Sequence, residues 1–162
     1  MVSVRPFAGE REAEASVAHC AILAVSIAGM AHEKRVEILW SDVDAYLHVN
    51  NAVYATYLEE CRDEWVDRTL EGVSDTWDFV LARVAIDFRR ELRLEDEEVV
   101  VSCSLVHIGN SSITLREQIR TRDGDLSAES KAVLVARDRD AGRSRLLKDT
   151  ERAAFERVLE PL

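Results

Sequence analysis

The chain has 162 residues, 47% of them hydrophobic, and carries a formal net charge of −10 at pH 7. This length and composition predict a single domain with a core large enough to need no disulfide support. The acidic balance argues against a nucleic-acid-binding surface, which requires a basic patch, but it leaves room for an anionic small ligand where basic residues cluster. Cys20, Cys61 and Cys103 match no zinc or redox spacing, so we expect reduced thiols in a cytoplasmic protein that holds no metal.

Residues 1–32 are expected to form an N-terminal extension, followed by the main domain at residues 33–162. The apolar stretch at residues 17–31 reads VAHCAILAVSIAGMA. It is too short for a membrane span and follows acidic residues rather than the basic leader of a secretory signal. Two interpretations stay open: an additional helix or disordered leader, or a protein whose translation begins at Met30.

A short strand at residues 36–40 is expected to precede a helix at residues 50–70. Asn50 or Asn51 suits the helix N-cap, because a short amide side chain can accept a hydrogen bond from the first turn. One helix face collects apolar side chains and the opposite face collects carboxylates, a pattern that predicts one buried and one solvated face. The apolar face comprises Tyr54, Tyr57, Leu58, Cys61 and Trp65.

Four long strands are predicted after the helix, at residues 79–89, 98–108, 112–122 and 126–138. Alternation within the second of these places Val99, Val101, Cys103 and Leu105 on one face. Gly109-Asn110 and Asp123-Gly124 supply turns between antiparallel neighbours. Asp149 could cap a short C-terminal helix that reaches Leu159. The order of elements indicates an α+β fold in which one helix packs on an antiparallel sheet.

Asp42 and Asp44 lie in the segment that leads into the predicted long helix. The first N–H groups of a helix have no partner within it and attract negative charge, including the charge that develops on a carbonyl oxygen under attack. A carboxylate just before a helix start can therefore serve as the nucleophile or base beside an oxyanion donor. Without further support, however, an aspartate at this position would be read as a loop or capping residue.

The segment WSDVDAYLHVNN, the helix AVYATYLEECRDEW and the strands VAIDFRREL and HIGNSSITLREQIRTRDG together resemble a known family. They are similar to hotdog-fold thioesterases of the 4-hydroxybenzoyl-CoA thioesterase-like superfamily, over about residues 34–139. The resemblance implies a hotdog fold, an antiparallel sheet wrapped around one long central helix. It also implies an acyl-thioester hydrolase that pairs its sheets into homodimers or homotetramers, with each active site between two chains.

By this resemblance Asp44 corresponds to the catalytic carboxylate, and the backbone N–H of Asn51 to the group that polarises the thioester carbonyl. His48 matches a histidine with an assigned catalytic role in the similar plant acyl-carrier-protein thioesterases. Leu47 departs from the glycine that relatives often carry, and Tyr46 replaces an asparagine of the plant enzymes, which implies a stiffer loop and a differently shaped pocket. The expected substrate-binding residues are Tyr46, Asn50, Tyr54, Ser111 and Ser112.

Several residue roles have two interpretations. Asp44 could attack the thioester carbon directly or deprotonate a water, and His48 could assist it or serve as a structural hydrogen-bonding residue. Asp42 is expected to organise the turn, and Glu59 to face solvent. A basic group could receive coenzyme A phosphates, although a solvated loop of alternating charge is the preferred interpretation; it comprises Arg137, Arg139, Arg143, Arg145 and Lys148.

The sequence therefore predicts hydrolysis of a fatty or aromatic acyl-CoA to free acid and CoA, without a cofactor or metal. The substrate could equally be an acyl-carrier-protein thioester, and no nucleic-acid or membrane partner is expected. Two alternatives from other classes are a hotdog hydratase-dehydratase and a non-catalytic acyl-thioester-binding protein. Acyl preference, the choice between nucleophilic and general-base mechanisms, and dimer against tetramer are left open.

Overall fold

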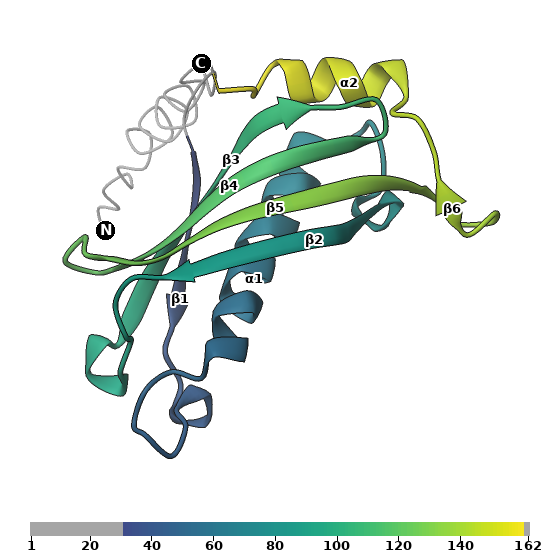
Figure 1. Ribbon diagram of the computed structural model, residues 1–162. Helices are drawn as coiled ribbons and strands as arrows, with labels where there is room; N and C mark the ends of the chain where they lie inside the picture. Colours follow the sequence, from purple (N-terminus) through teal and green to yellow (C-terminus); the bar gives the residue numbers. More distant parts are fainter. Residues whose placement is uncertain (1–30, 161–162) are drawn as a thin grey trace, which may run out of the picture.

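The computed structural model of the protein describes residues 31–160; the expectation about translation start at Met30 lies outside this range. A sheet of six strands and one long helix make up most of the structure (Figure 1). The strands are β1 (His32–Glu37), β2 (Phe79–Phe88), β3 (Glu98–Ile108), β4 (Ser112–Thr121), β5 (Leu126–Asp138) and the short β6 (Arg143–Ser144). The helices are α1 (Asn51–Thr69) and α2 (Asp149–Glu156), with 3-10 turns η1 (Trp40–Asp42), η2 (Thr76–Asp78) and η3 (Leu94–Asp96).

The sheet has the order β1-β3-β4-β5-β2, and β6 pairs with β5. All pairs of strands are antiparallel, and the two predicted turns join β3 to β4 and β4 to β5. The sheet curls around α1, with α2 near one end of β3 and β4 (Figure 1). The α+β expectation is therefore confirmed.

The predicted apolar face of α1 is confirmed. All five of its predicted residues are buried, and the helix packs against β1, β3 and β4. The inward face of β3 is also as predicted, since Val99, Val101, Cys103 and Leu105 are all buried. Strand β2 lies at the edge of the sheet and is exposed over most of its length.

The prediction of a strand at residues 36–40 was wrong at its C-terminal end. Strand β1 ends at Glu37, and residues 40–42 turn into η1. The Asp42 carboxylate accepts a hydrogen bond from the Leu39 N–H at 2.9 Å, which bends the chain away from the sheet. The C-terminal helix is also shorter than predicted, ending at Glu156, and Leu159 instead forms a bridge with Leu105 of β3.

A buried ion pair joins α1 to the sheet. Arg62 donates to Glu117 of β4 through Nε at 2.8 Å and through Nη2 at 3.3 Å, and both side chains are almost fully buried. Ser130 of β5 donates to the same carboxylate at 2.8 Å. Removing one member of such a pair leaves an uncompensated charge in the core, which typically costs about 3–5 kcal/mol.

We expect Glu117→Gln to lower the melting temperature by about 10 °C, because it leaves the Arg62 charge unpaired between the helix and the sheet. The measurement is thermal unfolding followed by circular dichroism. The double variant Arg62→Met/Glu117→Leu removes both charges and should recover most of the loss. A double variant no more stable than the single variant would show that lost packing, not the unpaired charge, causes the loss of stability.

A second charged cluster fastens α2 to the segment before β2. Arg145 donates from both terminal nitrogens to Glu151 at 2.8 Å, and the fully buried Glu151 also accepts from Ser74 and from the Lys148 backbone N–H. Burial alone would raise the pKa of Glu151, but these hydrogen bonds together lower it. The folded protein therefore favours the ionised carboxylate.

Because the folded pKa of Glu151 is below its unfolded value, its contribution is complete above the unfolded pKa of about 4.3 and is lost as the pH falls through the folded value. We expect the melting temperature of the wild type to decrease as the pH is lowered past about 4.5. Glu151→Gln should be less stable at pH 7 and show a smaller fall on acidification. Calorimetry between pH 3 and 7 measures both curves; parallel curves would contradict this role.

Candidate active site

The predicted catalytic loop is a tight hairpin that closes just before α1. Val43 and Val49 form an antiparallel bridge, and the Asp44 N–H donates to the His48 carbonyl at 2.8 Å. The Leu47 N–H donates back to the Asp44 carbonyl at 3.0 Å. Loops of this kind commonly place their last residue in the left-handed region, where glycine is favoured. Here Leu47 occupies that position with φ +64°, a conformation that costs an L-residue about 1–2 kcal/mol.

The two oxygens of the Asp44 carboxylate differ in their surroundings. Oδ1 accepts from the Tyr46 N–H at 2.8 Å and from the His48 N–H at 3.4 Å, and so holds the loop in shape. The hydrogen bonds of residues 31–160 include none to Oδ2. Asp44 is half-buried. The carboxylate is thus oriented by one oxygen while the other remains open for chemistry.

Asp42 organises the turn, as predicted from the sequence. Its Oδ2 accepts from the Leu39 N–H and from the Tyr57 hydroxyl at 2.7 Å, while its carbonyl accepts from the Asn50 N–H at 2.8 Å. Burial, together with the neighbouring Asp42 carboxylate, raises the pKa of Tyr57. Asp42 therefore fixes the end of β1, the hairpin and α1 relative to one another.

Helix α1 begins at Asn51, with Asn50 as its N-cap. The Asn50 side chain accepts from the Ala52 N–H at 2.9 Å, and its carbonyl accepts from the Val53 N–H at 2.8 Å. Within the described part of the chain, the Asn51 N–H donates to no other group. Asn50 thus has a capping role, and the first free N–H of the helix belongs to Asn51.

His48 contacts two residues that sequence reasoning did not single out. Its Nε2 lies 3.2 Å from Glu91 Oε2 and 3.2 Å from the Arg93 guanidinium, both just after β2. One nitrogen cannot donate to Glu91 and accept from Arg93 at once, so the tautomer of His48 decides which contact is a hydrogen bond. The sequence gives little indication of these contacts, because His48 lies far along the chain from both partners.

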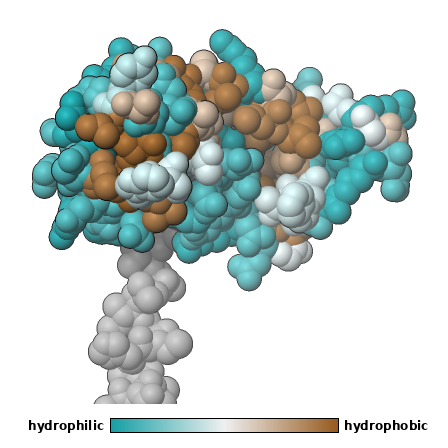
Figure 2. All heavy atoms as spheres, turned by 90° about the horizontal axis from the view of Figure 1, so that it is seen from below, coloured by the Kyte–Doolittle hydropathy of each residue, from teal (hydrophilic) through white to brown (hydrophobic). Residues whose placement is uncertain are grey.

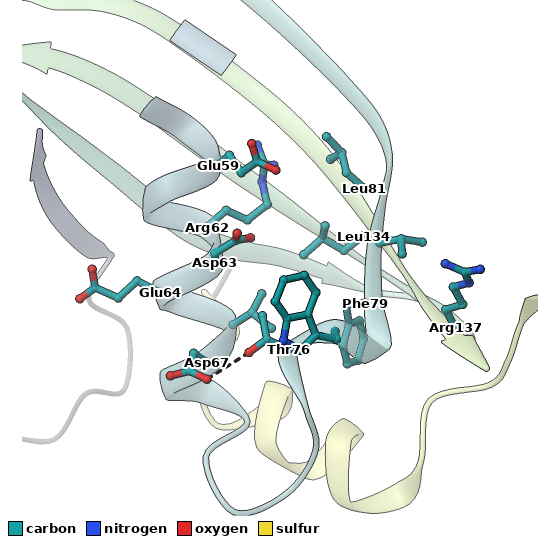
Figure 3. Close-up of a pocket in the computed structure, with 13 residues that line it drawn as sticks. Glu59, Arg62, Asp63, Glu64, Asp67, Thr76, Phe79, Leu81, Leu134 and Arg137 are labelled. Atoms are coloured by element: carbon teal, nitrogen blue, oxygen red, sulfur yellow. Dashed lines mark hydrogen bonds between the residues drawn. The ribbon is translucent and has the colours of Figure 1, made fainter. Parts of the chain in front are cut away.

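A cavity of about 630 Å³ lies between α1, η2 and β2 (Figure 3). Its walls combine apolar side chains, including Val66, Phe79 and Leu134, with carboxylates of α1 such as Asp63. Burial raises the pKa of Asp63, and the nearby Glu59 adds to this effect. Glu59 is exposed and lines the cavity. Asp44 does not line this cavity, and Arg62 lies roughly 16 Å along the helix from Asn51.

The remaining predicted substrate-binding residues occupy three different places. Tyr46 is highly exposed on the hairpin, while Tyr54 is buried with its hydroxyl accepting from the Leu92 N–H at 3.0 Å. Ser111 and Ser112 lie at the turn between β3 and β4. The Asp44 hairpin lies beside residues near the start of β3, whereas Ser111 and Ser112 follow the end of that strand. The eleven residues of β3 therefore separate these serines from Asp44 by roughly 30 Å. One chain does not bring them together.

Most of the predicted basic group is used within the protein. Arg139 contacts Asp75 and Asp78, and Lys148 lies 3.5 Å from Asp78, next to the Arg145 cluster. Arg137 lines the cavity, and Arg143 is exposed. Among residues 31–160, no group of three potential ligands is placed to hold a metal ion. None of the helices described is both long and apolar enough to cross a membrane.

The sequence profile of the thioesterase-like superfamily matches residues 38–159 of this chain. This range includes the hairpin, α1 and all strands except β1. The chain therefore belongs to the thioesterase-like superfamily, and its fold is the hotdog fold of that family. No curated protein matches the sequence.

Solved structures of the same fold include a thioesterase from Thermus thermophilus complexed with coenzyme A and Zn. It is 30% identical to this chain, with a TM-score of 0.71, over 80% of this chain and 96% of that one. A predicted thioesterase from Bacillus stearothermophilus is 24% identical, with a TM-score of 0.73 and coverage of 82% and 99%. Protein SAV2348 from Staphylococcus aureus, solved with CoA, shares the fold at 10% identity, with a TM-score of 0.71 and coverage of 83% and 89%.

Proposed function

We propose that this protein hydrolyses a fatty or aromatic acyl-CoA thioester to the free acid and CoA, with Asp44 as the catalytic carboxylate. The observation that carries the proposal is that Asp44 Oδ2 and the Asn51 N–H, on the hairpin and at the helix start that follows it, both lack a hydrogen-bond partner within residues 31–160. Membership of the thioesterase-like superfamily supports this chemistry. So does the coenzyme A bound to the Thermus thermophilus thioesterase.

The chemistry needs only a nucleophile and an oxyanion donor. A thiol with a pKa near 8.5 leaves readily as thiolate, so the leaving group needs little assistance. Asp44 Oδ2 either attacks the thioester carbon to form a mixed anhydride, which water then hydrolyses, or removes a proton from the attacking water. In both cases the carbonyl oxygen becomes negative, and the Asn51 N–H at the positive end of α1 stabilises it.

His48 takes an assisting role in this proposal. When its Nε2 carries the proton and donates to Glu91, its Nδ1 is left as an acceptor that can orient the attacking water. Glu91 then fixes the tautomer, while Arg93 competes for the same nitrogen. No cofactor or metal takes part in the proposed reaction. The free thiols of Cys61 and Cys103, both buried, suit a reducing cytoplasm.

The proposed enzyme is a homo-oligomer in which a second copy pairs along β2. Among residues 31–160, this ten-residue strand pairs only with β5, and it exposes Val80, Leu81, Val84 and Phe88. A long apolar edge is a template for pairing with another chain. A second copy is also the means by which Ser111 and Ser112 could approach the hairpin of this chain, since their own hairpin lies at the far end of the sheet.

Asp44→Asn is expected to reduce turnover at least a thousandfold with little change in melting temperature. The amide oxygen can still accept from the Tyr46 N–H and hold the loop, but an amide is neither a nucleophile nor a base here. The assay is thiol release from a panel of fatty and aromatic acyl-CoAs. Asp42→Asn offers a comparison that should disturb stability more than chemistry. Retained turnover in Asp44→Asn would assign the reaction to another residue.

Val84→Arg is expected to convert the oligomer to a monomer and to abolish most turnover, because it places a charge in the middle of the β2 edge. Sedimentation velocity gives the mass, and thiol release gives the activity. Leu146→Arg is the matched control, since Leu146 is an exposed leucine between β6 and α2. An active monomer would refute the shared site.

A further inference from the structure

Leu47 combines an unfavourable backbone conformation with an exposed apolar side chain. Its φ of +64° lies in the left-handed region, and 70% of the residue is exposed. Among residues 31–160, the only other non-glycine residue with positive φ is Glu97. A bulky side chain in this conformation is an outlier that persists where the surrounding structure or a function requires it.

The interior of the protein gives no reason for a leucine at this position. A glycine would adopt the same backbone without strain. The side chain is mostly exposed, so burial within its own chain contributes little to stability. The constraint on the side chain must therefore come from something that the hairpin contacts.

Leu47 belongs to a group of exposed apolar side chains around the Asp44 hairpin. We call these residues the hairpin rim: Leu39, Trp40, Tyr46 and Leu47. Trp40 is 82% and Tyr46 is 81% exposed. Figure 2 views the molecule from the end that carries this hairpin and shows hydrophobic residues gathered on that face. An apolar patch beside a polar site marks a surface for an apolar ligand or partner.

We infer that the hairpin rim, and Leu47 above all, contacts the acyl group of the substrate and so determines acyl preference. This inference rests on the proposed function. The Leu47 N–H donates to the Asp44 carbonyl, so the strained residue is bonded directly to the catalytic one. Tyr46 and Leu47 lie in the same hairpin as Asp44, so an acyl group whose thioester carbon reaches Asp44 Oδ2 is close to these two rim residues. The strain at Leu47 is thus retained for substrate contact at the expense of stability.

The inference predicts opposite effects of one substitution on stability and binding. Leu47→Gly relieves the backbone strain and should raise the melting temperature by about 2 °C. It removes an apolar contact and should weaken binding of decanoyl-CoA and benzoyl-CoA about tenfold. Acetyl-CoA, which lacks a large acyl group, should bind with unchanged affinity. Leu47→Asn tolerates the same backbone and should weaken binding of the two larger acyl-CoAs in the same way.

Binding is measured by calorimetry in the Asp44→Asn background, so that no ligand is hydrolysed. Glu97→Gly is the control: it also relieves a positive φ, at a residue whose carbonyl accepts from the Ile38 N–H, outside the hairpin. It should raise the melting temperature without changing any affinity. Sedimentation of each variant accompanies the titrations.

The outcomes separate the inference from the function on which it rests. Equal affinity of the Asp44→Asn parent and Leu47→Gly for all acyl-CoAs would overturn the role of Leu47 alone. Equal weakening of acetyl-CoA would also overturn it, because the contact would then be to the coenzyme A arm. Dissociation of the oligomer in Leu47→Gly would assign the rim to a second copy and overturn the acyl contact. A parent that binds no acyl-CoA would overturn the proposed function itself.

Discussion

The hydrogen bonds of Asp42 are the constraint on which the arrangement of the site depends. One carboxylate oxygen of Asp42 accepts from both the Leu39 N–H and the Tyr57 hydroxyl, and its carbonyl accepts from the Asn50 N–H. These bonds stop β1, position the hairpin and set where α1 begins. The two bonds to the half-buried carboxylate are charge-assisted, the kind that is costly to break, and the third is an ordinary backbone hydrogen bond. The hydrogen bonds of Asp42 thus help to position the hairpin that carries Asp44.

The helix that carries the proposed oxyanion donor is itself held in place by two unlike interactions. Its apolar face packs against β1, β3 and β4, which supplies most of the attraction but sets no unique depth along the axis. The pair between Arg62 and Glu117 is directional and buried, so it penalises any sliding of helix against sheet. A shift of the helix would move the Asn51 N–H away from the hairpin, which links core packing to the geometry of the proposed reaction.

The sequence predicted what regular patterns encode. Apolar spacing gave the buried face of α1, alternation gave β3, and turn residues gave the hairpins. The 3-10 turn at residues 40–42 was missed because a side-chain hydrogen bond from Leu39 to Asp42, not backbone propensity, ends the strand. The burial of Arg62 could have been predicted, since this residue lies on the helix next to the buried Leu58, Cys61 and Trp65. The contact of His48 with Glu91 joins distant segments that no local pattern connects.

The separation of the proposed site's parts within one chain is the main support for the proposed homo-oligomer. The hairpin and the start of α1 lie at one end of the sheet, while the turn carrying Ser111 and Ser112 lies at the other. The cavity between α1 and β2 opens beside an edge strand whose apolar side chains remain exposed. Antiparallel pairing of two β2 strands reverses one chain relative to the other, so that opposite ends of the two sheets come together. In this proposal the same contact buries the apolar edge and completes the proposed site.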